Sequence, residues 1–242
     1  TLLSVVGRDE AGAQLAKLLK RDKVSARLQR DAGIATTVKL RVIGRQQQLL
    51  RVDFETAPGH EVLAAKLREY RRLLGAHDVV ILSDYGKGGL AHIETMITAA
   101  RAAGKPVLAD PKGDDFKRYR GATVLTPNRN EFYQVAGRVR SEADFTARAQ
   151  KMRRTLMLDA LLVTRSEEGM TLYRRGSRLH VPAQAREVYD VSGAGDTVIA
   201  TLGVAIASRM PMDDAVRMAN RAAGIVVGKF GTATVQPAEL FD

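Results

Sequence analysis

The feature that most constrains the fold is an alternation of short apolar runs with longer segments of helical character in the middle of the chain. Strand-like runs rich in Val, Leu, Ile and Ala occupy residues 78–82, 106–109, 123–125 and 160–163. Strands that alternate with helices form a parallel sheet that is covered by helices on both faces. The sequence therefore predicts the α/β class. At 242 residues the chain is long enough for one large domain with a substantial core.

Each of these predicted strands ends in a polar loop. The four loops occupy residues 83–87, 110–113, 126–131 and 164–169. Ligands of open α/β sheets bind just beyond the carboxyl ends of the strands. We therefore expect the four loops to converge on one crevice.

A segment of different periodicity precedes this region, at residues 36–54. Val38, Leu40 and Val42 alternate with charged residues, and the alternation continues through residues 50–54 after a polar turn at residues 44–48. This period of two predicts a hairpin with one apolar and one charged face. Such a hairpin could cover a site or form an oligomer contact, and an edge hairpin with a solvated polar face is the alternative.

Other patterns complete the predicted set of elements. Apolar residues at helical spacing predict helices over residues 8–20, 62–74, 197–208 and 212–229. A second hairpin is predicted from residues 170–173 and 178–182.

Composition excludes several classes of protein. The chain has no cysteine, and its four histidines show no ligand spacing, which excludes a disulfide framework, thiolate chemistry and a dedicated zinc site. No apolar run approaches the length of a membrane span. The net charge of +11 comes from 38 basic residues dispersed among 27 acidic ones, and only 5% of residues are aromatic. This pattern lacks a basic tail or a stacking platform, so a nucleotide-sensing or nucleic-acid-binding protein is only a second hypothesis.

Residues 190–197 carry the strongest signal for chemistry. Gly193 and Gly195 flank Ala194 at the start of a helix-length segment, where glycines permit a tight turn and leave backbone amides facing an anion. Asp196 beside them could accept a proton from a substrate hydroxyl during phosphoryl transfer. The alternative is a tight turn followed by an ordinary first-turn acid. A dinucleotide fingerprint is excluded by Val198, and no Gly-Lys pair of the chain is followed by the Ser or Thr of a Walker A loop.

A second motif, Asn128-Arg129-Asn130-Glu131, follows the third predicted strand. Together with Gly193-Ala194-Gly195-Asp196 it resembles the ribokinase-like sugar kinase family, whose members pair an Asn-x-x-Glu motif with a later Gly-Ala-Gly-Asp motif. Within this family, the surrounding segments resemble the heptose 7-phosphate kinases; they are residues 82–88, 110–113, 119–123, 163–167, 187–191 and 226–229. The resemblance covers essentially the whole chain.

The resemblance implies an activity and roles for these motifs. The implied reaction transfers the ATP γ-phosphoryl group to the anomeric hydroxyl of D-glycero-β-D-manno-heptose 7-phosphate, giving the 1,7-bisphosphate for lipopolysaccharide core synthesis. Asp196 matches the family's catalytic base, and Gly193, Ala194 and Gly195 match its anion hole. Asn128 and Glu131 match the motif that positions Mg²⁺ through water. Further residues that the resemblance places at the nucleotide are Arg129, Asn130, Thr164, Arg165, Glu168, Lys112, Asn220 and Gly224.

The resemblance also assigns residues to the sugar. The family carries a β lid at the position of the predicted hairpin, often shared across a homodimer, and lid closure would exclude water. The expected sugar-binding residues are Lys87, Asp84, Arg41, Arg51 and Asp53. For Lys87 and Lys112 simple exposure is the alternative, and for Asn220 it is a polar helix face. The implied protein is a cytoplasmic homodimer that binds ATP and a sugar phosphate, with no nucleic-acid or membrane partner.

The chain departs from the family at its start. Family members begin with a strand and a Gly-Gly-Asn segment before the position of Thr1. We therefore expect a single kinase domain over residues 1–242 that lacks its N-terminal segment, with the lid hairpin at residues 36–54 inserted within it. Because that segment and the lid choose the substrate, the alternative is a kinase for another sugar, sugar phosphate or nucleoside, or a catalytically silent nucleotide-binding homologue.

Overall fold

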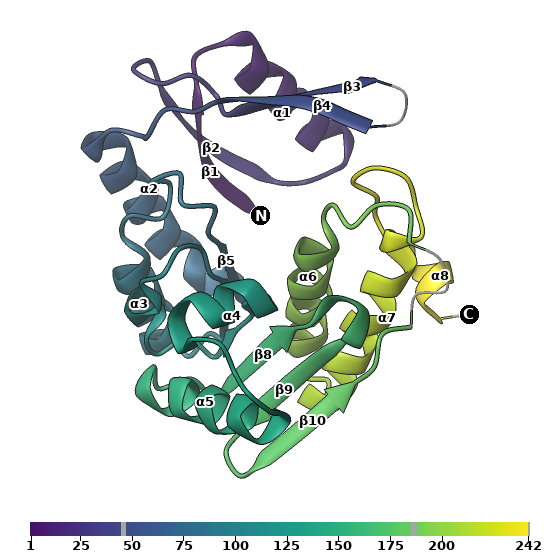
Figure 1. Cartoon of the computed structure of the whole chain (residues 1–242). Coiled ribbons are helices and arrows are strands. Elements are labelled where there is room, and N and C mark those ends of the chain that lie inside the picture. The colour runs from purple at the N-terminus through teal and green to yellow at the C-terminus, as the bar shows by residue number, and fades with distance from the viewer. Residues whose placement is uncertain (45–46, 185–187, 242) are drawn as a thin grey trace. The chain divides into compact units, whose positions relative to one another are not determined.

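The computed structural model describes residues 1–44, 47–184 and 188–241. Its elements fall into two compact units, each with sheet structure of its own (Figure 1). The smaller unit comprises Thr1–Leu73 with Gly86–His92, and the larger comprises Leu74–Tyr85 with Ile93–Asp242. The assignment of residues 1–242 to a single kinase domain stays a prediction.

A six-stranded sheet forms the centre of the larger unit, in the strand order β10-β9-β8-β7-β6-β5. Strands β5 to β8 are parallel, whereas β9 pairs antiparallel with both β8 and β10. All four predicted strands and the second predicted hairpin are confirmed. The strands are β5 (Val80–Ser83), β6 (Val107–Asp110), β7 (Val124–Leu125), β8 (Ala160–Thr164), β9 (Met170–Arg174) and β10 (Ser177–Val181).

Helices cover both faces of this sheet, as the alternation of elements predicts. Alternate strand residues point to opposite faces. Leu172 belongs to the core shared with α6 and α7, whereas its neighbour Tyr173 stacks on Phe145 of α5 with ring centroids 6.1 Å apart. The helices of this unit are α3 (Ile93–Ala102), α4 (Arg129–Ala136), α5 (Glu142–Thr155), α6 (Ala194–Ala207), α7 (Met212–Val227) and α8 (Pro237–Phe241).

The smaller unit begins with a βαβ arrangement. Strands β1 (Leu2–Gly7) and β2 (Ala26–Asp31) are parallel and are joined through α1 (Glu10–Arg21). Asp9 caps α1 by accepting a hydrogen bond from the amide of Gly12 at 2.8 Å. Our sequence reasoning located α1 but not β2, because β2 alternates charged and apolar residues too weakly to show a period.

The predicted lid hairpin is also present in the smaller unit. Strands β3 (Val38–Gly44) and β4 (Gln47–Phe54) pair antiparallel, and α2 (His60–Leu73) follows them. Val38, Leu40 and Val42 lie opposite Phe54, Val52 and Leu50, so these residues share one face of the hairpin. The predicted turn at residues 44–48 includes Arg45 and Gln46, which lie outside the described residues.

Among the helices of the described residues, none combines the length and the apolar character needed to span a bilayer.

Candidate active site

The amino end of α6 carries the glycine motif. Gly193 has a φ of 81°, and a Cβ atom there would come within 3.1 Å of the Thr232 side chain, so glycine is required on both counts. In the described part of the chain, no side chain caps this helix end. The amide of Ala194 donates to the carbonyl of Val191 at 3.2 Å. The next two amides belong to the first turn of a helix and have no intrahelical acceptor, so Gly195 and Asp196 offer the N–H donors for an anion.

Gly195 differs from Gly193 because its surroundings are open. A Cβ atom built at Gly195 has no atom of a neighbouring residue within 4 Å. The fold itself therefore does not require glycine at this position. What a side chain would obstruct is the space in front of the free amides, which is where an anion would lie.

Tyr85 contacts the predicted catalytic base. Its hydroxyl donates a 2.6 Å hydrogen bond to Oδ1 of Asp196, across 111 positions of sequence. Burial and this hydrogen bond raise the pKa of Tyr85 to about 12, so the phenol stays protonated and acts as a donor at neutral pH. The Asp196 side chain is exposed, which leaves its other oxygen accessible to a substrate.

Asp110, at the end of β6, shares this region with two other carboxylates. Burial, and after it the charges of Glu131 and Asp196, raise its pKa to about 7. The hydroxyl of Thr126 donates to Asp110 at 3.3 Å and opposes the shift only in part. The carboxylates of Asp110, Glu131 and Asp196 thus form a cluster where the strand ends meet the amino end of α6. The negative charge of this cluster exceeds what the surrounding groups neutralise.

The Asn128-to-Glu131 motif forms a capping box at the start of α4. The Glu131 amide donates to Oδ1 of Asn128 at 2.9 Å, and the Asn128 amide donates to Oε2 of Glu131 at 3.0 Å. Such a box satisfies amides that the helix leaves free. The second carboxylate oxygen of Glu131 accepts from Nζ of Lys112 at 3.1 Å. The motif therefore has a structural role, and it holds Glu131 at the edge of the cluster of three carboxylates.

The other loop residues that are predicted from the sequence to bind the nucleotide are connected to one another by backbone pairing, hydrogen bonds and ion pairs. An isolated bridge pairs Asn128 with Thr164, so the loops after β7 and β8 run side by side. Arg129 donates to the carbonyl of Arg165 at 2.7 Å and pairs with Glu168 at 2.7 Å. Asn130, on the first turn of α4, is exposed.

Arg165 is more buried than its neighbours. Only 6% of the residue is exposed, and its guanidinium pairs with Glu142 and Glu168 and lies 4.8 Å from the ring centroid of Phe145. These hydrogen bonds raise the pKa of Arg165 further above its usual range. Its observed contacts hold the loop to α5, and a contact with nucleotide stays a prediction.

Helix α7 lines one side of a cavity. Gly224 lines it with residues that follow β10 and with the start of α8, and its volume is about 600 Å³. Asn220, one turn earlier in α7, is buried and donates to the carbonyl of Pro182 at 2.9 Å. Asn220 therefore does not lie on a solvent-exposed face of the helix, and its contact with nucleotide stays a prediction. The cavity lining comprises Gln184, Tyr189, Arg221, Gly224, Ile225, Gly228 and Glu239.

Asp84 is buried and follows directly after β5, at the carboxyl end of that strand. Its Oδ2 accepts a 2.8 Å hydrogen bond from Tyr119 and lies 3.7 Å from Arg118. Its amide donates to the carbonyl of Asp110 at 3.0 Å, which ties the loop after β5 to the end of β6. The predicted contact of Asp84 with sugar stays a prediction.

The remaining predicted sugar residues lie in the smaller unit. Lys87 pairs with Glu55, and Arg51 pairs with Asp53 at 3.0 Å. Arg41 lies directly opposite Arg51 in the hairpin register. Two like charges in this position destabilise a hairpin. Asp53 offsets part of this repulsion through its ion pair with Arg51, and an anion bound beside Arg41 would offset more of it.

Sequence reasoning did not include Tyr85 and Asp110 in the site. Both lie in segments that it singled out, directly after predicted strands. The one signal in the sequence that could have identified Tyr85 and Asp110 as site residues is their position after the ends of predicted strands. In the described part of the chain, no cluster of three or more His, Cys, Asp or Glu side chains is arranged to hold a metal ion directly.

Known proteins match nearly the whole length of the chain. The family model described as "pfkB family carbohydrate kinase" matches residues 1–239. The D-beta-D-heptose 7-phosphate kinase of Bordetella bronchiseptica is 52% identical over 240 residues, which cover 99% of this chain and 77% of that protein. The bifunctional protein HldE of Aeromonas salmonicida is 54% identical over 241 residues, covering 99% of this chain and 50% of that protein. The chain thus spans about half the length of such bifunctional relatives.

Solved structures share the fold. Phosphofructokinase-2 from Escherichia coli has a TM-score of 0.83 at 15% identity, covering 98% of this chain and 78% of that chain. Ribokinase from Giardia lamblia has a TM-score of 0.81 at 20% identity, covering 98% and 80%. At these identities the likeness shows the fold alone, and it confirms the predicted ribokinase-like class.

Proposed function

Because the chain belongs to the pfkB family of carbohydrate kinases, we propose that it transfers the γ-phosphoryl group of ATP to the anomeric hydroxyl of D-glycero-β-D-manno-heptose 7-phosphate. The product is heptose 1,7-bisphosphate, an intermediate on the way to the lipopolysaccharide core. Relatives with 52–54% identity carry the name of this kinase or of the bifunctional protein HldE, which supports the choice of sugar.

The observation that carries the chemistry is the arrangement at the amino end of α6. Asp196, oriented by the Tyr85 hydroxyl at 2.6 Å, accepts the proton of the attacking hydroxyl. The free amides of Gly195 and Asp196 stabilise negative charge on the transferring phosphoryl group. Base and anion donors lie on one helical turn, which keeps them in fixed geometry.

The cluster of three carboxylates fits a hydrated Mg²⁺ ion. Asp110, Glu131 and Asp196 are hard oxygen donors. Burial, together with repulsion from the other two carboxylates, raises the pKa of Asp110 to about 7, and a divalent cation would relieve that repulsion. Glu131 and Asn128 would hold the ion through its water ligands, with Asp110 beside them. When bound, Mg²⁺ neutralises charge on the ATP phosphates. Lys112, which reaches Glu131 at 3.1 Å, provides a second positive charge there.

Separate observations support the proposed binding of the nucleotide base and of the sugar phosphate. The cavity lined by Gly224 is large enough for a nucleotide base, and its lining includes the apolar Ile225 and the ring of Tyr189. For the sugar phosphate, the opposed pair of Arg41 and Arg51 provides cations that an anion would stabilise. Lys87 and Asp53 complete the proposed sugar contacts.

The test is ADP release against a panel of sugar acceptors. Heptose 7-phosphate should give the highest kcat/KM, well above fructose 6-phosphate and ribose. The Asp196→Asn variant should bind ATP as the wild type does and lose roughly two to four orders of magnitude in kcat. Equal use of the three acceptors would overturn the sugar assignment, and a fully active Asp196→Asn variant would overturn the mechanism.

The exposed apolar face of the hairpin supports a homodimer formed through β3 and β4. Leu40, Leu50 and Phe54 are 51%, 55% and 52% exposed, an unusual state for three large apolar residues on one hairpin face. Leu40→Glu should shift the protein from dimer to monomer in light scattering after size-exclusion chromatography. Lys39→Glu, on the opposite face of the same strand, is the matched control and should stay dimeric. An unchanged mass for Leu40→Glu would place the contact elsewhere.

A further inference from the structure

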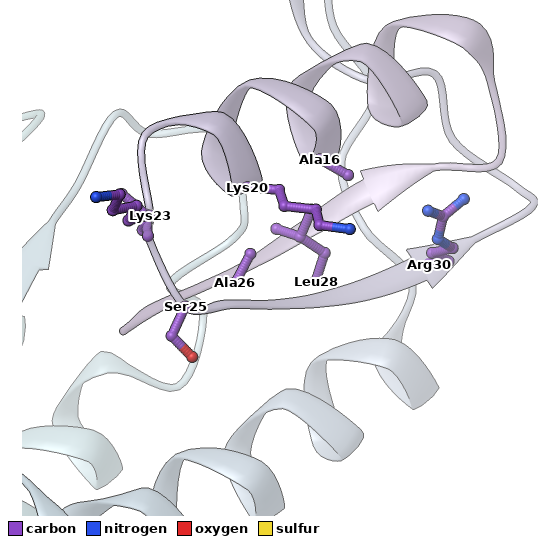
Figure 2. Close-up of a pocket in the computed structure, with 8 residues that line it drawn as sticks. Ala16, Lys20, Lys23, Ser25, Ala26, Leu28 and Arg30 are labelled. Carbon is purple, nitrogen blue, oxygen red and sulfur yellow. The ribbon is translucent and has the colours of Figure 1, made fainter.

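A cavity in the smaller unit lies outside the proposed active site. It is formed by α1, the loop that follows it and β2, and its volume is about 590 Å³ (Figure 2). Ala16, Ala26 and Leu28 contribute an apolar floor. Lys20, Lys23 and Arg30 stand around this floor, with Lys20 between the other two (Figure 2). The cavity is therefore apolar at its base and basic at its rim.

The basic rim is not neutralised by the protein. Lys20, Lys23 and Arg30 are exposed, and among the described residues they form no ion pair. None of the residues that line the cavity is acidic. The acidic residues nearest in sequence are engaged elsewhere, since Asp22 pairs with Arg21 and Asp31 accepts from the amides of Gly33 and Gly59. Within the described part of the chain, three cations thus share a concave surface without a partner of opposite charge.

The same surface includes a strand edge. β2 pairs with β1 alone in their two-stranded sheet. The Leu2 amide donates to the Ser25 carbonyl at 2.8 Å, and Leu2 is in register with Ala26. In a parallel pair this register turns the amide and carbonyl of alternate residues away from the neighbouring strand. The outward-facing backbone groups are therefore those of Ala26, Leu28 and Arg30, which also line the cavity.

We propose that the free edge of β2 and the cavity beside it bind an extended acidic peptide segment of a partner protein. Addition of a strand to an exposed edge uses backbone hydrogen bonds for affinity and alternate side chains for specificity. Side chains at alternate positions recur about every 6.6 Å along one face of a strand. Acidic residues at such positions would meet the row formed by Lys23, Lys20 and Arg30 (Figure 2), with small apolar groups over Leu28.

Other occupants match fewer of these features. A second copy of this chain would bring Lys20, Lys23 and Arg30 against the same cations. A small inorganic anion would use the cations and leave the strand edge and the apolar floor uncovered. Basic residues also protect edge strands from pairing with other chains, and in that case nothing binds. The acidic extended peptide is the occupant that uses charge, backbone edge and floor together, and this inference does not depend on the proposed kinase activity.

The test is fluorescence anisotropy of the full chain with a fluorescein-labelled peptide in which Glu and Val alternate. Two control peptides replace every Glu with Lys, or the central Val with Pro, which removes a strand donor. We expect saturable binding of the Glu–Val peptide and at least about 10-fold weaker binding of both controls, as loss of ion pairs or of strand pairing requires. Excess sodium triphosphate should reduce the affinity only partly.

Variants of the chain separate charge from strand pairing. The triple variant Lys20→Glu/Lys23→Glu/Arg30→Glu should weaken binding at least about 10-fold. Its control, Arg138→Glu/Lys151→Glu, places negative charge at exposed sites of the larger unit.

Ala26→Pro removes one outward amide at the first position of the strand, where proline is tolerated, and should weaken binding about 3- to 10-fold. Ala26→Val keeps that amide and should bind as the wild type does. Circular dichroism verifies folding of each variant, and if Ala26→Pro fails to fold, the Pro-containing peptide tests strand pairing instead.

Several results would overturn the inference. The absence of saturable binding would mean that the basic residues only protect the edge. Equal binding of the Pro-containing peptide, or complete displacement by triphosphate, would indicate a general anion site. Equal loss in the control variant from the larger unit would indicate attraction to net charge alone.

Discussion

Replacement of Asp110 by Asn should stabilise the protein, and the gain should grow as pH rises from about 4 to about 7. Burial and the charges of Glu131 and Asp196 raise the pKa of Asp110 from 3.8 to about 7. Between these pH values the folded chain keeps a proton that the unfolded chain has released. The free energy of unfolding of the wild type therefore falls with rising pH over this window and is level above it.

The size of the effect follows from the same pKa values. A gap of about three pH units corresponds to roughly 4 kcal/mol, at about 1.4 kcal/mol for each unit. Relaxation of the surroundings and water entry reduce the cost of a buried charge, so we expect the Asn variant to be roughly 2–4 kcal/mol more stable at pH 8. At pH 4 the two proteins should be nearly equal, because Asn resembles the protonated acid and its carbonyl still accepts from Thr126.

The measurement is urea unfolding of both proteins between pH 4 and pH 8, followed by far-ultraviolet circular dichroism because the chain has no tryptophan. EDTA removes divalent cations that would bind the carboxylates. Asp114→Asn, an exposed position four residues away, is the matched control and should change stability by less than about 0.5 kcal/mol. A stability difference for Asp110→Asn that is constant with pH, or that shrinks as pH rises, would refute the reasoning.

Two further predictions concern the amino end of α6. Gly195→Ala should leave the free energy of unfolding unchanged or raise it by up to about 1 kcal/mol, because the position is helical and open. Its kcat should fall roughly 10²- to 10³-fold in the ADP-release assay, the scale of a lost anion-hole donor, and wild-type turnover would remove Gly195 from the anion site. Tyr85→Phe should lower kcat about 3- to 10-fold through loss of the 2.6 Å hydrogen bond to Asp196, with KM for ATP unchanged. A loss of the same size when Tyr85→Phe is added to Asp196→Asn would show that Tyr85 does not act through Asp196.

Local patterns were sufficient for the strands of the larger unit, for the β3–β4 hairpin and for the order of the motifs. The period of the apolar residues located the strands of the central sheet and the β3–β4 hairpin, because burial of one face imposes that period on the chain. The Gly193-to-Asp196 motif identified a helix start with free amides, since glycine and a first-turn acid act within one turn. The helix itself begins at Ala194, earlier than residue 197 where the apolar period starts.

Contacts between distant parts of the chain were beyond the reach of those patterns. The Tyr85 hydroxyl reaches Asp196 only because β5 ends close to the residues where α6 begins. The pKa of Asp110 depends on burial and on charges from two other loops, and none of these has a local signature. Similarly, the basic cavity arises where α1 packs beside β2, a strand that periodicity did not detect.

By itself, the sequence determined the class of fold, the family and the helix turn that carries Asp196, because each depends on neighbours within a few residues. The tertiary structure decided which side chain contacts Asp196, which carboxylate holds a proton near neutral pH, and which strand edge of the described residues stays open. Distances, burial and charge between remote segments follow from the path of the whole chain through space, and no local pattern encodes them.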